Sequence, residues 1–228
     1  MIKYNTIMFD VDDTILDFKR GEEVALKSLL GEIGAPQNSH IISEYRKINK
    51  MLWRDFEKGD TDRDYIFTNR FTMLFKKYGI EVDGVQMEQK YRSYLDMQHE
   101  QVDGACEVLD YLHSKCLLYV VTNGVSSTQY KRLSDANMNR YFDKIFVSDD
   151  IGYQKPMREF FETVTAEIPE YDPKKTLIVG DSLGADILGG INVGIDTCWL
   201  NRFGEEASEI VPNYEIKSLN EIFNIVKK

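Results

Sequence analysis

Short apolar runs are separated by longer amphipathic stretches over most of the chain. The first run, Thr6–Phe9, leads directly into Asp10 and is typical of a buried strand. Similar runs predict strands at Leu117–Val121, Lys144–Val147, Thr176–Val179 and Thr197–Leu200. Amphipathic stretches predict helices at Ala105–Ser114, Ser127–Asn137, Pro156–Ile168 and Ala185–Val193. Pro156 suits the first turn of its helix. Strands that alternate with helices indicate an α/β fold, with a Rossmann-like parallel sheet and right-handed crossovers.

Residues 20–95 show helical periodicity instead. Two stripes of apolar residues at spacings of three and four mark helix faces that would pack inside a bundle. The stripes are Ile41, Tyr45, Ile48, Leu52 and Phe56, and then Phe67, Phe71, Phe75 and Tyr78. We therefore expect two domains, an α/β core of residues 1–16 and 101–228 and an inserted all-helical domain of residues 17–100.

The net charge of −10 is concentrated outside this insert. Residues 16–100 carry 14 basic and 15 acidic side chains, whereas the rest of the chain carries 14 and 23. A nucleic acid polymer is excluded as a bulk partner, because phosphate binding needs a basic surface. An acidic domain that handles a small anion needs a metal ion or well-placed cations.

The cysteines predict neither a zinc site nor a disulfide framework. Cys106, Cys116 and Cys198 form no CxxC pair, and their odd number favours a reducing compartment. The aspartate-containing N-terminus lacks the apolar stretch of a signal peptide. The longest apolar run, about Leu117–Val121, is too short to cross a membrane. We therefore expect a cytoplasmic protein without a membrane partner.

Polar residues stand at the ends of three predicted strands. They are Asp10-Val11-Asp12-Asp13-Thr14, Thr122-Asn123-Gly124 and Gly180-Asp181-Ser182, and Lys155 lies at a loop-to-helix junction. Because ligands bind at the carboxyl ends of parallel strands, we expect these side chains to converge. Clustered carboxylates raise one another's pKa unless a cation is present. Mg²⁺ binds oxygen ligands, and Asp10 and Asp181 are the natural pair.

Each of these residues also has a structural explanation. An aspartate at a strand end is often a helix cap or turn residue. Thr122 alone is compatible with a strand-terminal hydroxyl, and Lys155 alone with a surface lysine. Their occurrence together, in one order, favours a functional site. An EF-hand loop is excluded because Ile15 stands where its glycine belongs, and the chain has no P-loop sequence.

The segments DVDDT, VVTNG and GDSLGAD, with the lysine of QKP, resemble the four motifs of the haloacid dehalogenase-like (HAD) hydrolase superfamily. The resemblance spans residues 6–186. A helical insert directly after the first motif is similar to the type 1 cap of that superfamily. The runs Asn49–Gly59 and Asp186–Asn201 resemble its pyrimidine 5′-nucleotidase branch, whose members dephosphorylate nucleoside monophosphates.

The resemblance implies a Mg²⁺-dependent phosphomonoesterase that works through an aspartyl phosphate. Asp10 is the implied nucleophile. Asp12 is the implied acid that protonates the leaving alkoxide, and then the base that activates water. Lys155 would neutralise negative charge, and Thr122 with neighbouring backbone N–H groups would bind phosphoryl oxygens. Asp12 favours a phosphatase over a dehalogenase, because a halide leaves without a proton.

The implied Mg²⁺ ligands are the carboxylates of Asp10 and Asp181 and the backbone carbonyl of Asp12. Asp186 is implied to act from further out, by orienting a metal-bound water. Asp13 is assigned a structural role.

In the helical insert, Trp53 is the candidate substrate-binding residue. It lies one position off the stripe of Leu52 and Phe56. Packing inside the bundle is one explanation for this indole, and stacking on a nucleobase is the other. Asn49, Lys50 and Arg54 are also within reach of a nucleoside on this reasoning, although a solvated helix face is the simpler expectation for them.

Other functions stay open. A sugar-phosphate phosphatase or phosphomutase would use the same core. A signalling receiver domain also combines a phospho-accepting aspartate with threonine, lysine and Mg²⁺, but it is half as long and has no cap. A binding module without catalysis would lack a motif residue, and none is missing. We expect a small phosphomonoester substrate and a monomer, with a dimer as the alternative.

Overall fold

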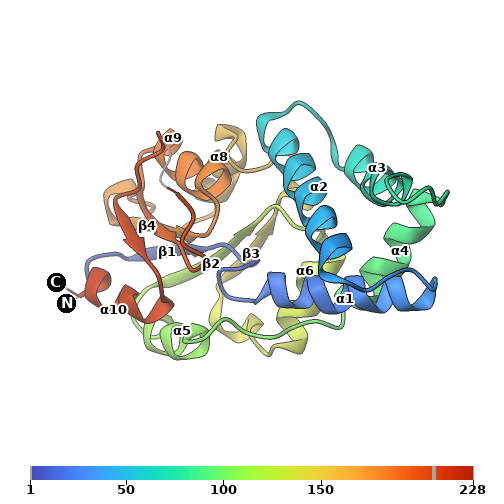
Figure 1. The fold of residues 1–228 in the computed structure, drawn as a ribbon. Helices are drawn as coiled ribbons and strands as arrows, with labels where there is room; N and C mark the ends of the chain where they lie inside the picture. The colour runs from blue at the N-terminus through green and yellow to red at the C-terminus, as the bar shows by residue number, and fades with distance from the viewer. Residues whose placement is uncertain (1, 207–208, 228) are drawn as a thin grey trace. The chain divides into compact units, whose positions relative to one another are not determined.

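The computed structural model describes residues 2–206 and 209–227 of the chain. The chain divides into two compact units, one formed by residues 1–18 and 99–228 and the other by residues 19–98. The first unit contains the sheet, and the second is helical (Figure 1). The expectation that the helical unit acts as a cap stays a prediction.

A six-stranded sheet forms the centre of the first unit, in the order β3-β2-β1-β4-β5-β6. The strands are β1 Thr6–Phe9, β2 Leu117–Thr122, β3 Lys144–Val147, β4 Thr176–Gly180, β5 Asp196–Leu200 and β6 Tyr214–Ile216. Neighbouring strands pair in parallel throughout, so the predicted fold class is confirmed. Sequence reasoning missed β6, because three residues are too few to show a periodicity.

The two faces of the sheet bury alternate residues of the same strands. Ile7 and Phe9 of β1 belong to one apolar cluster, whereas Met8 packs with Phe160 and Phe161 in another. Burial on both faces explains why the strands are unbroken apolar runs. The helices of this unit are α5 Ala105–His113, α6 Ser126–Asp135, α7 Ser148–Ile151, α8 Arg158–Ala166, α9 Leu188–Val193 and α10 Ile222–Val226.

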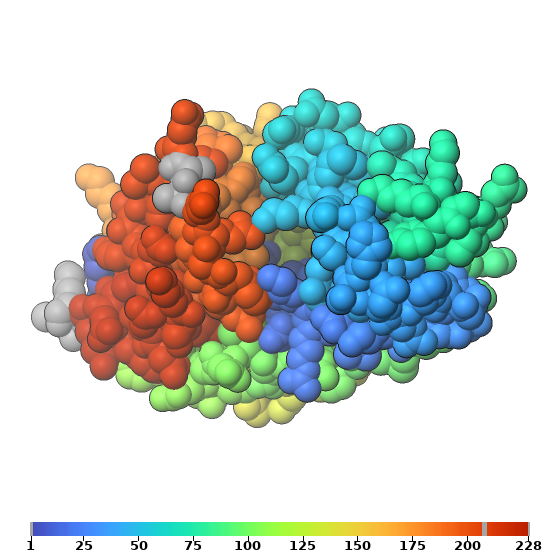
Figure 2. Space-filling model, viewed as in Figure 1, coloured from blue at the N-terminus to red at the C-terminus, as the bar shows by residue number. Residues whose placement is uncertain are grey.

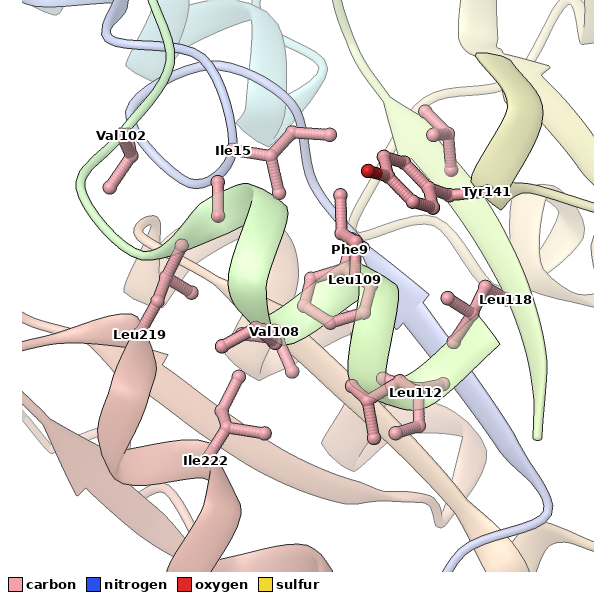
Figure 3. Packing of buried hydrophobic residues seen from close by; sticks show 14 of the residues in the cluster. Phe9, Ile15, Val102, Val108, Leu109, Leu112, Leu118, Tyr141, Leu219 and Ile222 are labelled. Atoms are coloured by element: carbon pink, nitrogen blue, oxygen red, sulfur yellow. The ribbon is translucent and has the colours of Figure 1, made fainter. Parts of the chain in front are cut away.

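Figure 3 shows how the first of these clusters is closed by the C-terminal segment. Phe9 of β1 faces Val108 and Leu109 of α5, and Leu219 and Ile222 pack against the same helix from the other side. On the surface, the C-terminal segment (red) lies directly beside α5 (green), as Figure 2 shows. The end of the chain is therefore part of the core of the first unit.

The helix predicted at Pro156 starts later than expected. The Lys155–Pro156 peptide is cis, and α8 begins at Arg158. Pro156 does not lie in the first turn, because side chains bind the backbone of Lys155 and Pro156 before the helix begins. The side chain of Asn123 binds the N–H and C=O of Lys155, and Nδ2 of Asn192 donates to the carbonyl of Pro156 at 3.1 Å.

The helix predicted at Ala185–Val193 consists of two pieces. A π-helical turn, Leu183–Ile187, precedes α9. The hydroxyl of Ser182 caps this turn by accepting a hydrogen bond from the N–H of Ala185 at 3.1 Å. Such turns are frequent at functional sites, and this one carries Asp186.

Four helices make up the second unit, as the periodicity predicts: α1 Phe18–Glu32, which starts at the last residue of the first unit, α2 Ser39–Lys58, α3 Arg63–Lys76 and α4 Gly84–Leu95. The whole first stripe is buried, and the ring of Tyr45 stacks on that of Phe71 with 5.4 Å between centroids. Within the described ranges, no helix has both the length and the apolar character needed to cross a membrane.

A buried polar network lies inside the helical unit. Arg70 forms two hydrogen bonds of 2.7 Å with the carboxylate of Glu88, and a third of 3.0 Å with the amide oxygen of Asn49. The Asn49 amide nitrogen donates to Glu22 at 3.0 Å. The expectation of a solvated face is therefore wrong for Asn49, which is buried because its amide joins two charged side chains.

Candidate active site

Three strand ends meet at one edge of the sheet. β1 lies between β2 and β4, and Phe9 is paired with a residue of each. The chain leaves β1 at Asp10, whose N–H donates to the carbonyl of Val179 at 2.9 Å. Thr122 ends β2, and Asp181 follows β4. The parallel register therefore brings the polar ends of these strands together.

Asp10, Asp181 and Asp186 form an acidic cluster at this edge. Each offers a carboxylate oxygen, and the three oxygens lie within 4.8 Å of one another. Asp186 is thus part of the cluster, and its expected role in orienting a metal-bound water stays a prediction. Gly180 makes room for it, since a Cβ at Gly180 would collide with the Asp186 carboxyl group. The N–H of Ser182 donates to the same carboxylate at 3.1 Å.

Lys155 is buried beside this cluster, which excludes the surface-lysine explanation. Its Nζ donates to Asp10 at 2.7 Å, to Asp186 at 2.6 Å and to the carbonyl of Val121 at 2.8 Å. These contacts use all three ammonium hydrogens. Burial lowers the pKa of Lys155, but the two carboxylates outweigh this effect and raise its pKa above the usual value. The side chain is therefore a cation.

Asn123 holds the backbone of Lys155 in place. Its Oδ1 accepts from the Lys155 N–H and its Nδ2 donates to the Lys155 carbonyl, both at 2.9 Å. The backbone N–H groups of Asn123 and Gly124, next to Thr122, stay the predicted contacts with the substrate, whereas the Asn123 side chain holds the backbone of Lys155.

Burial and crowding raise the pKa of two carboxylates in the cluster. Burial, with neighbouring carboxylates adding to it and Lys155 opposing it, raises the pKa of Asp10 to about 8. Burial and the charges of Asp10, Asp13 and Asp186 raise the pKa of Asp181 well above its usual value. The negative forms are thus unfavourable without a further cation.

Asp181 is the residue that points most directly to a metal ion. In the part of the chain that the structure describes, its carboxylate has no hydrogen bond or ion pair. Its backbone carbonyl accepts a hydrogen bond of 2.7 Å from Nε1 of Trp199, which fixes the main chain here. An all-oxygen donor set with excess negative charge suits a hard divalent cation. The residues present therefore fit Mg²⁺.

Asp12 is held by two residues that the sequence analysis did not single out. Its Oδ1 accepts from Arg132 at 2.5 Å, and its Oδ2 accepts from Nε2 of Gln129 at 2.8 Å. Nε2 of Gln129 also donates to the hydroxyl oxygen of Thr122 at 2.8 Å, and the N–H of Gly124 donates to that oxygen at 3.1 Å. Gln129 and Arg132 are both buried and come from α6. The sequence offered one signal for them, because Gln129 and Arg132 are polar residues three positions apart in the helix predicted after VVTNG.

Asp13 lies in a strained turn tied to the loop after β5. Its φ is 58°, in the left-handed region. Arg202 lies 3.8 Å from the Asp13 carboxylate, and it also pairs with Asp17 at 3.1 Å. These contacts fix the turn that follows Asp10, which is consistent with a structural role for Asp13.

Trp53 lies in the helical unit and is half-buried. Its ring meets Phe56 and Phe67 edge-on, with centroids 5.6 and 6.5 Å apart. These contacts are those of helix packing, and a role on substrate stays a prediction.

The model of the haloacid dehalogenase-like hydrolase family matches residues 4–194 of the chain. The chain belongs to this family. The family predicted from the motifs is thereby confirmed, and the protein is an enzyme of the hydrolase class.

Similar proteins cover the chain from end to end. The HAD-hydrolase YfnB of Bacillus subtilis is 47% identical over 99% of this chain and 97% of its own length. Its crystal structure, described as bound to magnesium, superimposes with a TM-score of 0.94 over 97% of this chain and 98% of that one. The pyrimidine 5′-nucleotidase PynA of Streptococcus pneumoniae is 37% identical over 99% of this chain and 96% of its own. The pyrimidine 5′-nucleotidase YjjG of Escherichia coli is 27% identical over the full length of both.

Proposed function

We propose that this HAD-like hydrolase is a Mg²⁺-dependent phosphomonoesterase that acts on nucleoside 5′-monophosphates and prefers pyrimidines. The observation that carries the proposal is the cluster of Asp10, Asp181 and Asp186 with buried Lys155, adjoined by Asp12. It combines a carboxylate nucleophile, a fixed cation and a second carboxylate for proton transfer. The relatives PynA and YjjG, both called pyrimidine 5′-nucleotidases, support the substrate class.

The proposed reaction has two displacements at phosphorus. Asp10 attacks first, so that a bond forms between its Oδ and phosphorus while the bond from phosphorus to the 5′ oxygen breaks. Asp12 gives a proton to the departing oxygen, because an alkoxide is a poor leaving group. Asp12 then takes a proton from the water that attacks the aspartyl phosphate, which releases inorganic phosphate and restores Asp10.

The surrounding residues assist through charge and position. Lys155 favours the anionic form of Asp10 and offsets charge on the transferring group. Thr122 donates its hydroxyl hydrogen to a phosphoryl oxygen. Mg²⁺, held by Asp10, Asp181 and the Asp12 carbonyl with Asp186 nearby, would supply charge neutralisation at the phosphoryl oxygens. We assign substrate selection to a cap formed by the helical unit, with Trp53 as its candidate contact with the base.

A substrate panel tests this proposal. Phosphate release is measured for deoxyuridine and deoxythymidine monophosphates, glucose 6-phosphate and β-glucose 1-phosphate. We expect the two nucleotides to have the higher kcat/KM values, with modest discrimination between bases. If the sugar phosphates lead by about tenfold or more, the nucleotidase assignment is wrong and the enzyme is a sugar-phosphate phosphatase or mutase.

A further inference from the structure

Gln129 and Arg132 connect two parts of the proposed reaction that are otherwise separate. The amide of Gln129 donates one N–H to Asp12 and the other to Thr122, each at 2.8 Å. Its Oε1 accepts from Nη1 of Arg132 at 3.1 Å. Both N–H groups and the oxygen of the Gln129 amide therefore have a hydrogen-bond partner. The reversed amide would turn an N–H toward Arg132, so the partners fix its orientation.

The contacts of Thr122 determine where its own hydrogen can point. A hydroxyl has one hydrogen and two acceptor sites. The hydroxyl oxygen accepts from Nε2 of Gln129 and from the N–H of Gly124, which fills both sites. The hydrogen is therefore directed away from these two donors and is available to a phosphoryl oxygen. Without the Gln129 amide, the hydroxyl could rotate.

The contacts of Asp12 determine where its carboxylate lies. Arg132 binds one oxygen at 2.5 Å and Gln129 binds the other, so both ends of the carboxylate are held from the same helix. Arg132 is itself fixed: its side chain is buried, and its guanidinium lies 5.6 Å from the ring centre of Phe18. Asp12 is more open, with 30% of its side chain exposed.

We infer that Gln129 and Arg132 are positioning residues that place the Asp12 carboxylate and aim the Thr122 hydroxyl for phosphoryl transfer. The inference rests on the proposed function. In the first displacement, Asp12 passes its proton to the 5′ oxygen as the bond to phosphorus breaks, and it becomes a carboxylate. Arg132 and Gln129 bind that carboxylate, which then takes a proton from the attacking water. Neither residue gains or loses a proton.

Leaving-group dependence separates positioning from a merely structural role. The variants are Gln129→Met, which keeps the shape but lacks the amide, and Arg132→Lys, which keeps the charge but lacks the guanidinium. We expect kcat/KM for deoxyuridine monophosphate to fall about 10- to 100-fold. For 4-nitrophenyl phosphate, whose leaving group needs little protonation, Arg132→Lys should lose less than about threefold. Gln129→Met should lose more than that, because Thr122 serves both substrates.

The control is Lys131→Gln, which removes a positive charge from the exposed face of the same helix and should leave both activities unchanged. Melting temperatures show whether each variant is folded, and if Arg132→Lys does not fold, Gln129→Met alone carries the test. Equal losses on both esters in Arg132→Lys, or no loss in either variant, overturn the inference while the proposed function stands. If the wild type hydrolyses neither ester, the proposed function fails and the inference fails with it.

A double-mutant cycle tests whether Arg132 acts through Asp12. Asp12→Asn alone should lower kcat/KM for the nucleotide about 10²- to 10⁴-fold. Adding Arg132→Lys to that variant should lower it by less than about twofold more, because residues that act as a unit are not additive. Independent, multiplied losses would mean that Arg132 acts by another route and would overturn its assignment.

Discussion

At the scale of the residue, Asp10 combines burial with a fixed cation. Its carboxylate is 2.7 Å from Nζ of Lys155, and Asp181 and Asp186 offer oxygens within 4.8 Å. Even with Lys155 beside it, the negative form of Asp10 is unfavourable until a further positive charge approaches. The crowding of carboxylates that destabilises the free site therefore favours the binding of a divalent cation.

The first prediction concerns Asp10→Asn. The amide has almost the same shape but cannot attack phosphorus, so turnover of a nucleoside monophosphate should fall below about 1% of wild type. The measurement is phosphate release, with deamidation excluded by mass spectrometry. Residual turnover well above that level would remove Asp10 from its role as nucleophile.

Strand-end residues could be predicted from the sequence, whereas their partners could not. Asp10, Thr122 and Asp181 each follow or end an apolar run, and parallel strands bring such ends together. Gln129 and Arg132 lie 117 and 120 positions from Asp12, and a pattern along the chain carries no distance between such residues.

At the scale of the element, the strands follow the hydrophobic pattern closely, whereas the helices predicted to start at Pro156 and Ala185 do not. A strand buried on both faces must be apolar throughout, so its bounds are visible in the sequence. A helix start depends on what binds the preceding backbone. At Lys155 and Pro156 the partners are the side chains of Asn123 and Asn192, which no local rule anticipates.

The second prediction concerns the junction between β4 and the π-helical turn. Gly180→Ala should move Asp186, because the added Cβ would collide with its carboxyl group. Overpacking of this kind costs about 1–3 kcal/mol, and the displaced carboxylate should lower kcat by about tenfold or more. Urea unfolding and phosphate release measure the two effects.

Gly31→Ala is the matched control for this change. Gly31 lies in α1, and the added methyl group meets only the end of the flexible Gln37 side chain. Activity should be unchanged and stability altered by no more than about 1 kcal/mol. Wild-type activity in Gly180→Ala would mean that the site does not depend on the position of Asp186.

The third prediction concerns the polar network between the helices of the second unit. Arg70→Met removes the partner that Glu88 and Asn49 share, whereas Glu88 keeps Arg92 and Asn49 keeps Glu22. Because two buried acceptors lose a charged donor, the free energy of unfolding should fall by about 3 kcal/mol. Lys90→Ala breaks an exposed pair with Glu32 and should cost no more than about 1 kcal/mol. Urea unfolding of both variants checks this, and equal small losses would show that the buried network adds little to stability.

At the scale of the whole molecule, the two units have different polar character. The α/β unit carries most of the negative charge and holds the acidic cluster, whereas the helical unit is nearly neutral and buries the ion pair of Arg70 and Glu88. The change in periodicity and charge along the sequence is the reason why we expect two domains. The sequence could not decide between packing and base stacking for Trp53, since a side chain that packs a bundle and one that stacks on a base have the same spacing.

The fourth prediction links stability to pH and Mg²⁺. The pKa of Asp10 is raised to about 8 in the metal-free fold, from a usual value of 3.8. This group therefore contributes stability that is present at acidic pH and is lost as the pH rises toward about 8. Mg²⁺ bound at the cluster would compete with these protons, so the increase in Tm on adding it should be larger near pH 8 than near pH 5.5. Equal increases at both pH values would contradict this coupling.

Hydrolysis of phosphate esters by the acidic cluster with Mg²⁺ is tested most directly by phosphate release from deoxyuridine monophosphate, measured with chelated enzyme as Mg²⁺ is added back. We expect no turnover after chelation and full recovery with Mg²⁺. Asp181→Ala should need Mg²⁺ in the millimolar range or above, because it removes the carboxylate that lacks a protein partner. Full activity after exhaustive chelation would show that the cluster works without a metal ion and would overturn the proposed mechanism.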